Sequence, residues 1–460
     1  MRTGDRQRTG WIGDGTAALL TDLYELTMID ALLEEGLGEE AVFSLFVRRL
    51  PPRRNYLVAC GLDVALAILE RLRFSEPALA YLDSLGIFSA RLLDWLRAFR
   101  FTGDVHAIAE GTPVFRDEPL LEVVAPLPEA QLVETVIMNQ VHFQTVAASK
   151  AARIVTAARG RTVVDFGVRR MPGADAGVKI ARAAYLAGVD STSNLAAGQI
   201  FGIPVAGTMA HSYVQAHEDQ LDAFRAFVRV HPRTVLLVDT YDTVEGVRDV
   251  VRLARELGPA FQVTAVRLDS GDLTELSRAA RRILDGAELR SVGIFASGGL
   301  DEDAIARLVD AGAPITGFGV GTALGVSEDA PSLDMAYKLV AYAGRGRMKL
   351  SPGKALLPGR KQVFRSEREG LAEGDVIACH DEDLPGRALL TQVMRGGQRV
   401  GEPPELGDLR AWARAQRGTL PRRLLALAPA DPPYPVEVSA KLAATRDALA
   451  ARLSAPRRRG

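Results

Sequence analysis

Between residues 160 and 325, short β-rich runs alternate with stretches whose apolar residues recur at helical spacing, and this alternation constrains the fold more than any other feature. Alternation of this kind specifies a parallel sheet. Because the units repeat at intervals of roughly 25–30 residues, they favour a closed or nearly closed α/β barrel, with an open doubly wound sheet as the alternative. The runs are TVVDFG (162–167), IPVAGT (203–208), TVLLVDT (234–240), VTAVRLDSG (263–271), VGIFASGG (292–299) and ITGFGVGT (315–322).

The segments on either side of these runs have other patterns. Residues 22–35 predict an amphipathic helix that begins with a capping box formed by Asp22 and Glu25. Short β-like runs mixed with helical stretches over 41–125 are typical of an α+β layer, and 129–159, without Pro or Gly, predicts one or two helices. The segment DMAYKLVAYAG (334–344) predicts a further helix.

Charge and cysteine content exclude several classes of protein. Lys and Arg number 56 against 57 Asp and Glu, so no global basic field attracts nucleic acid or acidic lipid, and we expect neither as a partner. Two cysteines, Cys60 and Cys379, cannot build a disulfide framework or a CxxC zinc site. No stretch approaches the roughly 18 apolar residues of a membrane span and no signal peptide is recognisable, so we expect a cytoplasmic protein.

The residues that close the β runs are unusually polar. In an α/β barrel the carboxyl ends of the strands surround the active site, so residues far apart in the sequence should meet there. These residues are Asp165, Phe166, Arg169, Ser191, Thr192, Ser193, Asn194, His211, Ser212, Asp239, Asp242, Arg267, Asp269, Asp272, Ser297, Gly298, Gly299, Gly317, Gly319 and Gly321.

Two glycine-rich turns follow the last two runs. Small residues there let an anion approach the backbone, and SGGLDEDAIARLV leads into a helix whose first N–H groups would be unpaired. We therefore expect the turns around Ser297–Gly299 and Gly319–Gly321 to bind phosphate; ordinary tight turns are the alternative.

The motif RLDSGDL offers charged groups beside these turns. Asp269 and Asp272 are suited to accept hydrogen bonds from ribose hydroxyls or to hold magnesium through water. The alternative is that Ser270 or Asp272 caps the following helix. Arg267 would place a cation beside the same substrate, or it is a structural partner of Asp269.

An aromatic ring and a histidine complete the candidate site. Phe166 and Arg169 together suit a flat anionic ring, although Phe166 alone is more typical of a core. His211 is placed to act as a base or phosphate acceptor if Asp239 orients its ring, and a structural histidine is the alternative. These features predict a barrel enzyme that handles a phosphosugar.

Several motifs occur here in the order seen in one family, and the chain resembles nicotinate phosphoribosyltransferases over roughly residues 19–365. The resemblance implies the ATP-assisted joining of nicotinic acid to phosphoribosyl pyrophosphate in NAD salvage. The motifs are LLTDLYELTM (19–28), EGTPVF (110–115), EAQLVET (129–135), DFGVRR (165–170), STSN (191–194), GTMAHS (207–212), LLVDTYDT (236–243), RLDSGD (267–272), SGGLDE (297–302) and GFGVGT (317–322).

The resemblance also implies a fold, the type II phosphoribosyltransferase arrangement. This is an α/β fold in which an irregular α/β barrel has a companion α/β sandwich domain formed by N- and C-terminal segments. On this basis we expect a flexible tail over 1–17, the first part of the sandwich over 18–128, the catalytic barrel over 129–345 and a return to the sandwich over 346–460.

Several site residues follow from the resemblance alone. Phe166 is similar to the residue that stacks on the pyridine ring, with Tyr24 of a neighbouring subunit on the opposite side, which implies a homodimer. Arg169 is similar to the arginine that meets nicotinate or the phosphate of its nucleotide. The turn near the pyridine substituent contains Ser191, Thr192, Ser193 and Asn194.

The resemblance assigns roles around the phosphates as well. His211 is similar to the histidine that ATP phosphorylates, and Asp239 to the acid that orients it. Asp269, with Arg267 beside it, matches the carboxylate at the ribose hydroxyls. The expected phosphate-binding residues are Ser297, Gly298, Gly299, Gly319, Gly321 and Thr322.

ATP and Mg²⁺ are the implied cofactors, and the residues that would hold the metal are left unassigned. The alternatives are a phosphoribosyltransferase that uses nicotinamide or quinolinate on a similar fold, and a non-catalytic metabolite sensor. Quinolinate would demand a denser basic cluster, and nicotinamide an acidic or amide partner near the ring.

Overall fold

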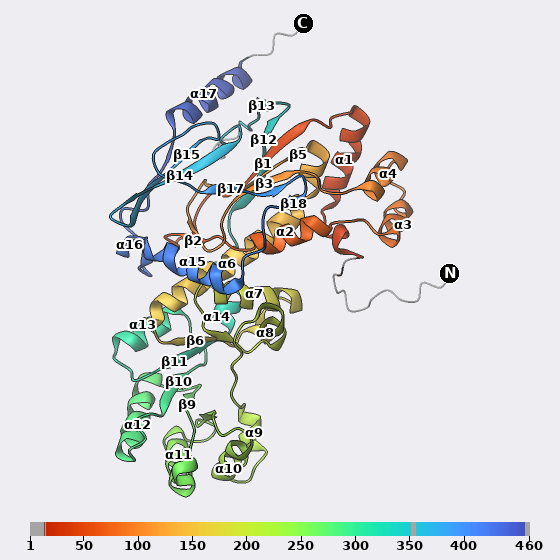
Figure 1. Cartoon of the computed structure of the whole chain (residues 1–460). Coiled ribbons are helices and arrows are strands. Elements are labelled where there is room, and N and C mark those ends of the chain that lie inside the picture. Colours follow the sequence, from red (N-terminus) through yellow and green to blue (C-terminus); the bar gives the residue numbers. More distant parts are fainter. Residues whose placement is uncertain (1–12, 14, 351–355, 456–460) are drawn as a thin grey trace.

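The computed structural model describes residue 13 and residues 15–350 and 356–455. Most of the expected N-terminal tail therefore lies outside the described residues. Figure 1 shows an antiparallel part built from both chain ends and a parallel part built from the middle of the chain, with the long helix α6 (Glu134–Ala158) between them.

The middle of the chain forms a curled parallel sheet of six strands, which confirms the expected irregular barrel. In sheet order these are β7 (Ser191–Thr192), β6 (Thr162–Asp165), β11 (Gly317–Val320), β10 (Gly293–Ala296), β9 (Ala265–Leu268) and β8 (Val235–Leu237). Five of the six expected runs become strands. The run 203–208 contributes only an isolated bridge between Thr192 and Val205, because Pro204 has no N–H to donate to a ladder. Within the described residues, no backbone pairing joins β8 to β7 or to the bridge at Val205, so the sheet is not closed.

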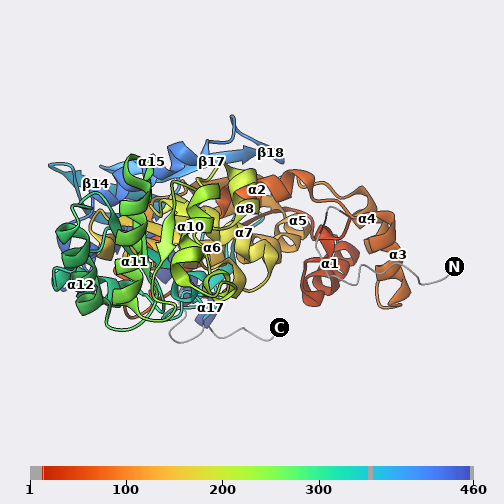
Figure 2. The same ribbon diagram turned by 90° about the horizontal axis from the view of Figure 1, so that it is seen from below.

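Helices connect these strands as the apolar periodicity predicts. Figure 2 shows α10, α11 and α12 along one side of the parallel part, where α11 contacts both of its neighbours. The helices of this part are α7 (Ala174–Leu186), α8 (Leu195–Phe201), α9 (His211–Gln215), α10 (Gln220–Val230), α11 (Thr243–Leu257), α12 (Leu273–Gly286), α13 (Glu302–Asp310) and α14 (Thr322–Gly325), with 3-10 turns η2 (Val168–Arg170) and η3 (Gly258–Ala260).

The companion domain is built from both chain ends, as expected. Its main sheet, in order, is β13 (Arg345–Gly346), β12 (Met335–Tyr342), β1 (Glu40–Val47), β5 (Pro119–Pro126), β3 (Asp104–Ile108), β17 (Leu390–Arg395) and β18 (Gln398–Arg399). A second sheet runs β16 (Arg387–Ala388), β14 (Lys361–Arg368), β15 (Leu371–Cys379) and β19 (Val436–Val438), and β2 (Leu57–Val58) pairs with β4 (Pro113–Val114). We expected a domain boundary after residue 345, but β13 (Arg345–Gly346) spans this position as part of the main antiparallel sheet.

The remaining helices pack around these sheets. They are η1 (Ala17–Leu19), α1 (Leu23–Glu35), α2 (Leu62–Arg71), α3 (Glu76–Ser84), α4 (Ala90–Ala98), α5 (Leu127–Leu132), α15 (Leu406–Gly418), α16 (Arg422–Leu425) and α17 (Ala440–Ser454). The helices expected over 22–35 and 129–159 are confirmed as α1 and as α5 with α6. No helix in the described ranges is long and apolar enough to cross a membrane.

The helix expected over 334–344 is wrong. This segment forms β12, which pairs with β1 along its length and places the buried Tyr337 in a stack on Phe43, with ring centroids 4.8 Å apart. Its Ala, Leu, Met and Lys residues favour a helix locally, but pairing with a strand some 300 residues away overrides that weak preference.

The capping box at the start of α1 is also wrong. Asp22 occupies the N-cap position without a side-chain cap hydrogen bond. Glu25 is fully buried and accepts a hydrogen bond of 2.6 Å from Thr135 of α6 and another from Thr21. The Asp22 N–H, which a capping box would pair with Glu25, donates to the Thr135 hydroxyl instead.

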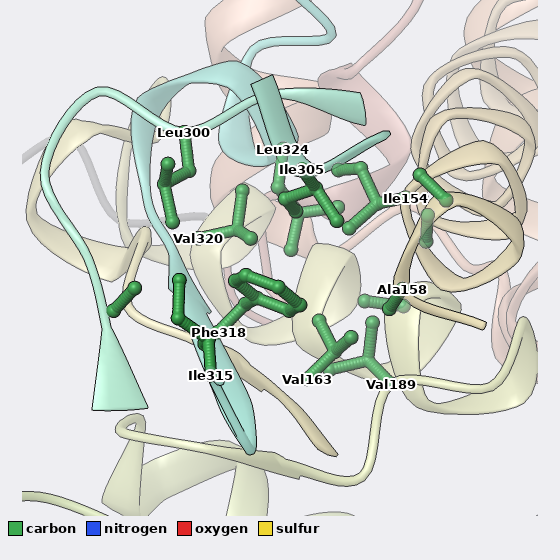
Figure 3. Close-up of a cluster of buried hydrophobic side chains, with 14 of the residues drawn as sticks. Ile154, Ala158, Val163, Val189, Leu300, Ile305, Ile315, Phe318, Val320 and Leu324 are labelled. Carbon is green, nitrogen blue, oxygen red and sulfur yellow. The ribbon is translucent and has the colours of Figure 1, made fainter. Parts of the chain in front are cut away.

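Behind the parallel strands lies an apolar core that fixes their position. Figure 3 shows Ile154 and Ala158 of α6 in one cluster with Phe318 of β11, Ile305 of α13 and Leu324 of α14. The polar residues at the ends of these strands are therefore attached to a rigid, closely packed support.

Candidate active site

Arg267 of β9 connects several of the polar strand ends. Its guanidinium donates hydrogen bonds to the Ser297 hydroxyl at 2.8 Å, the Thr208 hydroxyl at 2.6 Å, the Met209 carbonyl at 3.2 Å and the Asp269 carboxylate at 2.7 Å. These partners come from three different βα connections. The side chain is therefore a structural partner of Asp269 and also holds the segments around the site together.

Asp269 is fixed as an anion at the centre of this group. One carboxylate oxygen, Oδ1, accepts hydrogen bonds from Arg267 and from the Ser297 hydroxyl. Burial alone would raise the pKa of this carboxyl, but the hydrogen bonds from Ser297 and Arg267 and the nearby His211 hold the pKa below its usual value. The other oxygen, Oδ2, accepts no hydrogen bond from the described residues, so it is available to a ligand.

Phe166 presents an aromatic face next to this anion. Its backbone N–H donates to the Val320 carbonyl at 2.8 Å, which fixes the residue at the end of β6 beside β11. The half-buried ring lies against Gly319, 6.0 Å from the Phe295 ring between centroids, and the Arg267 guanidinium lies 5.7 Å from its centroid. An aromatic face beside a cation and a carboxylate can accept a flat, charged ring.

His211 begins α9, and its side chain is 38% exposed. Its Nδ1 lies 3.2 Å from the Thr240 hydroxyl, and its Nε2 lies 3.9 Å from Asp269 Oδ2. One ring nitrogen is thus held by Thr240 while the other faces the Asp269 carboxylate.

Asp239 has different partners from those expected. Its Oδ2 accepts hydrogen bonds of 2.8 Å from the Asp269 backbone N–H and from the Ser270 hydroxyl. Among the described residues, the ring of His211 is hydrogen-bonded to Thr240 and not to Asp239. Asp239 therefore shapes the RLDSGD turn directly, and its effect on the histidine stays a prediction.

The first glycine turn approaches the backbone of β9 very closely. A Cβ atom at Gly298, where φ is +88°, would lie 1.9 Å from the Asp269 carbonyl oxygen, so only glycine fits. Beyond Gly299 the chain enters α13, whose N-cap Asp301 accepts a hydrogen bond of 2.7 Å from the Ala304 N–H. We expected the first N–H groups of this helix to be unpaired, and for Ala304 this is wrong, because its N–H already donates to the Asp301 carboxylate.

The second glycine turn has a double use. Gly319 makes room for the Phe166 ring, and Gly321 precedes the short helix α14, which begins at Thr322. A side chain at 319 would push the ring away. The structure thus connects this turn to the aromatic face, and its contact with phosphate stays a prediction.

Residues 191–194 divide into two kinds. The Thr192 hydroxyl donates to Asp165 at 2.8 Å, and the Asn194 side chain caps α8, so both buried side chains have internal partners. Ser191 and Ser193 are half-buried. These two serines are the members of the motif still open to a ligand.

Two expected residues have no hydrogen bond to this group among the described residues. Arg169 is exposed in η2. Tyr24 is 46% exposed on α1, which packs on α4 and α5 in the antiparallel part, away from the parallel sheet in Figure 1. Phe166 and Tyr24 are therefore not brought together within a single chain.

Asp242 and Asp272, which were also expected at the strand ends, are both helix caps. Asp242 caps α11, and Asp272 caps α12 by accepting from the N–H groups of Thr274 and Glu275. The capping alternative for Asp272 is thus confirmed.

Three contributing residues were missed. Thr208, Thr240 and Phe295 contact Arg267, His211 and Phe166 respectively. Each lies at or near the end of a β run already noted, and that position was the available signal. Within the described ranges, no three His, Cys, Asp or Glu residues are grouped to hold a metal ion.

Comparison with known proteins places this arrangement in a family. A model of the nicotinate phosphoribosyltransferase N-terminal domain matches residues 19–142, and a model of the nicotinate phosphoribosyltransferase family matches residues 162–348. A nicotinate phosphoribosyltransferase of Mycobacterium tuberculosis is 55% identical over 426 residues, covering 92% of each chain, and one of Bacillus subtilis is 42% identical over 382 residues, covering 81% of this chain and 78% of the relative.

Solved structures agree with the sequence matches. The crystal structure of human nicotinic acid phosphoribosyltransferase superimposes with a TM-score of 0.83 at 28% identity, covering 93% of this chain and 99% of the human one. The chain therefore belongs to the nicotinate phosphoribosyltransferase family.

Proposed function

We propose that this chain joins nicotinic acid to phosphoribosyl pyrophosphate, giving nicotinate mononucleotide and pyrophosphate in NAD salvage, with hydrolysis of ATP. The observation that carries the proposal is the meeting of Phe166, Arg267, Asp269 and the Ser297–Gly299 turn at adjacent strand ends. A pyridine, a pentose and its anionic groups need an aromatic face, an acceptor and backbone donors in this proximity.

In this scheme the protein acts mainly by positioning. The pyridine nitrogen forms a bond to the anomeric carbon of the sugar as the bond from that carbon to pyrophosphate breaks. In the transition state the sugar is cation-like, so the ionised Asp269 stabilises it while accepting hydrogen bonds from its hydroxyls. Phe166 holds the ring in line, and no protein nucleophile need attack the sugar.

Magnesium fits the acidic groups present. Asp269 Oδ2 accepts no hydrogen bond from the described residues, and the buried Asp239 Oδ1 has no hydrogen-bond partner among them. Both are hard oxygen donors of the kind that Mg²⁺ takes directly or through water, with the substrate supplying the remaining ligands. When bound, the ion would neutralise charge on the departing pyrophosphate.

ATP dependence is assigned to His211. Its exposed ring carries Nε2 on the side facing Asp269, and Thr240 holds Nδ1. A phosphoryl group on this ring would add negative charge beside Asp269, which would change the affinity of the site for its anionic substrate and product. Hydrolysis of that group would couple ATP to turnover.

A homodimer completes the site in this proposal. Leu23, Tyr24 and Met28 of α1 are 56%, 46% and 40% exposed, an apolar surface on a single helix. Leu195, Ile200 and Val205, in and after α8 on the parallel part, are 74%, 61% and 53% exposed. The contact of these two surfaces between subunits would bury both and bring Tyr24 to the Phe166 of the neighbour.

The direct test is product analysis by mass after mixing the purified chain with phosphoribosyl pyrophosphate, magnesium, ATP and one of nicotinate, nicotinamide or quinolinate. We expect nicotinate mononucleotide from nicotinate. A preference for nicotinamide by about ten-fold or more, equivalent to about 1.4 kcal/mol, would contradict the substrate assignment. Binding of phosphoribosyl pyrophosphate without turnover of any pyridine would identify a sensor instead.

A further inference from the structure

The two glycine turns are connected to each other by one buried ammonium group. Glu302 begins α13, three residues after Gly299, and Asp329 follows the second turn beyond α14. Lys150 of α6 donates hydrogen bonds from Nζ to the Glu302 carboxylate and, at 2.7 Å, to Asp329 Oδ1. The chain segments leaving the two turns thus share one cation.

These groups are buried and their charges are matched. The side chains of Lys150 and Glu302 are 2% and 1% exposed, and that of Asp329 is 24% exposed. The pKa of Glu302, which burial would raise, is held below its usual value by Lys150 and Arg153, so the pair is ionic. A buried ionic pair is costly to break, because the remaining charge has no solvent to stabilise it.

Each carboxylate also has an arginine of its own. Arg153 donates from Nε to Glu302 at 2.8 Å, and Arg54 donates to Asp329 at 2.7 and 3.0 Å. Within the described residues, Lys150 is the side chain that bonds to both carboxylates. Its loss would therefore remove this side-chain link between the two turns while leaving each carboxylate paired with its arginine.

The strands before the turns are neighbours as well. β10 and β11 run parallel, with Phe295 opposite Gly317, so the turns that follow them lie side by side. Figure 3 shows Ile154, one helical turn after Lys150, in one cluster with Ile305 of α13 and Leu324 of α14. The lysine thus acts from a rigid helix already packed against both segments.

We propose that Lys150 is a positioning residue that fixes the spacing between the two glycine turns, and so sets the affinity for the pyrophosphate-bearing sugar. The inference rests on the proposed function, in which both turns receive anionic groups of that substrate. Two turns held at a set distance present their backbone donors without reorganisation, whereas uncoupled turns must be ordered when substrate binds.

The test is K150M, with K361M as the matched control. Lys361 is also a buried lysine, 4% exposed, whose ammonium lies 2.9 Å from the buried Glu122, but it lies in β14 of the companion domain. We expect K150M to raise the KM for phosphoribosyl pyrophosphate by about ten-fold or more while the KM for nicotinate changes by less than about two-fold. K361M should lower the melting temperature without separating the two KM values.

Equal effects of K150M and K361M on both KM values would overturn the proposal, because they would show that the lysine contributes only stability. If circular dichroism shows that K150M is unfolded, D329N replaces it, since this change weakens the link to the second turn at a less buried position. D329N should then raise the KM for the sugar substrate selectively, and an unchanged KM would overturn the proposal.

Calorimetric binding of phosphoribosyl pyrophosphate to the same intact chains separates this inference from the proposed function. A wild-type chain that binds the sugar but makes no nucleotide contradicts the function, and the dissociation constants of K150M and K361M still decide the role of Lys150. A wild-type chain that makes the nucleotide, with K150M as tight a binder as wild type, contradicts the inference alone. A wild-type chain that does not bind the sugar contradicts both.

Discussion

The ring of Phe166 lies against the backbone of Gly319 so closely that a Cβ atom at position 319 would come within 2.5 Å of ring atoms Cδ2 and Cε2. Non-bonded carbon atoms do not approach one another this closely, so the observed position of the ring requires glycine at 319. The position of β11 thereby determines the position of the Phe166 ring, on which the pyridine is proposed to lie.

Gly319→Ala should therefore displace Phe166 and impair binding of the pyridine. We expect the KM for nicotinate to rise by about ten-fold, because displacement of a positioning group by about 1 Å costs up to two orders of magnitude. Steady-state kinetics with nicotinate varied will measure this. Gly407→Ala, at a site with no atom within 4 Å of the added carbon, is the control and should leave the KM unchanged.

His211→Ala should abolish ATP hydrolysis and formation of the phosphoenzyme while leaving some ATP-independent product synthesis. The ring is the proposed phosphate acceptor, and the chemistry at the sugar does not need it. Acid-labile incorporation of labelled phosphate is the measurement. His217→Ala is the matched control, because His217 bonds to the Tyr213 carbonyl within the same region, and it should retain labelling. Persistent labelling of the His211 variant would remove that residue from the role.

Asp269→Asn should weaken binding of the sugar substrate with the fold retained. The neutral amide keeps the shape but loses the charge that faces the cation-like sugar, and we expect kcat/KM to fall by about two orders of magnitude. Asp272→Asn is the control, because Asp272 caps α12, and its KM for the sugar should stay at the wild-type value. Equal kinetics for the two variants would contradict the assignment of Asp269.

The protonation of Glu25 predicts a pH dependence of stability. Burial, which outweighs hydrogen bonds from Thr135 and Thr21, raises the pKa of this carboxyl from 4.5 to about 7. A raised pKa means that the folded state holds the proton more tightly, so this contribution to stability is complete below pH 4.5 and is lost as the pH rises to about 7. Glu25→Gln should reduce the loss of unfolding free energy over this interval, whereas Glu35→Gln, at an exposed position of the same helix, should not. Urea titrations at several pH values will show whether the two variants differ.

Mixing Tyr24→Ala with Phe166→Ala should restore activity if the site is shared between subunits. Each variant alone lacks one side of the proposed ring-binding site in both of its sites. In a mixed dimer, one site contains neither substitution and the other site contains both. Activity of the refolded mixture well above the sum of the separate variants is the expected result. A mixture no more active than its components would show that Tyr24 acts within its own chain or not at all.

The parallel part of the fold was predictable because its signals are local. Strands β6, β8, β9, β10 and β11 each coincide with a β-rich run, and the convergence of Phe166, Asp269 and Ser297 follows from the rule that parallel strands end on one side. A tight turn at Gly298 was also predictable, because glycine is the residue that most readily adopts the positive φ found there.

The remainder depended on distant partners. β12 becomes a strand through β1, and Glu25 bonds to Thr135 of α6, and neither distant partner is visible in the local sequence. The sequence around Lys150 does contain one signal: a lysine within the mainly apolar run VAASKAARIV implies a buried cation, and a buried cation requires acidic partners. The sequence does not say that those partners are Glu302 and Asp329.

The interleaving of chain ends in the main antiparallel sheet has a consequence for biosynthesis. Strand β1 awaits β12, and β3 awaits β17, so this sheet remains incomplete until nearly 400 residues have left the ribosome. The parallel strands all lie between residues 162 and 320 and become available together well before that. The nascent chain therefore carries β1 and β3, each able to pair with β5 but open on its other edge, throughout the assembly of the parallel part, and open strand edges of this kind promote aggregation.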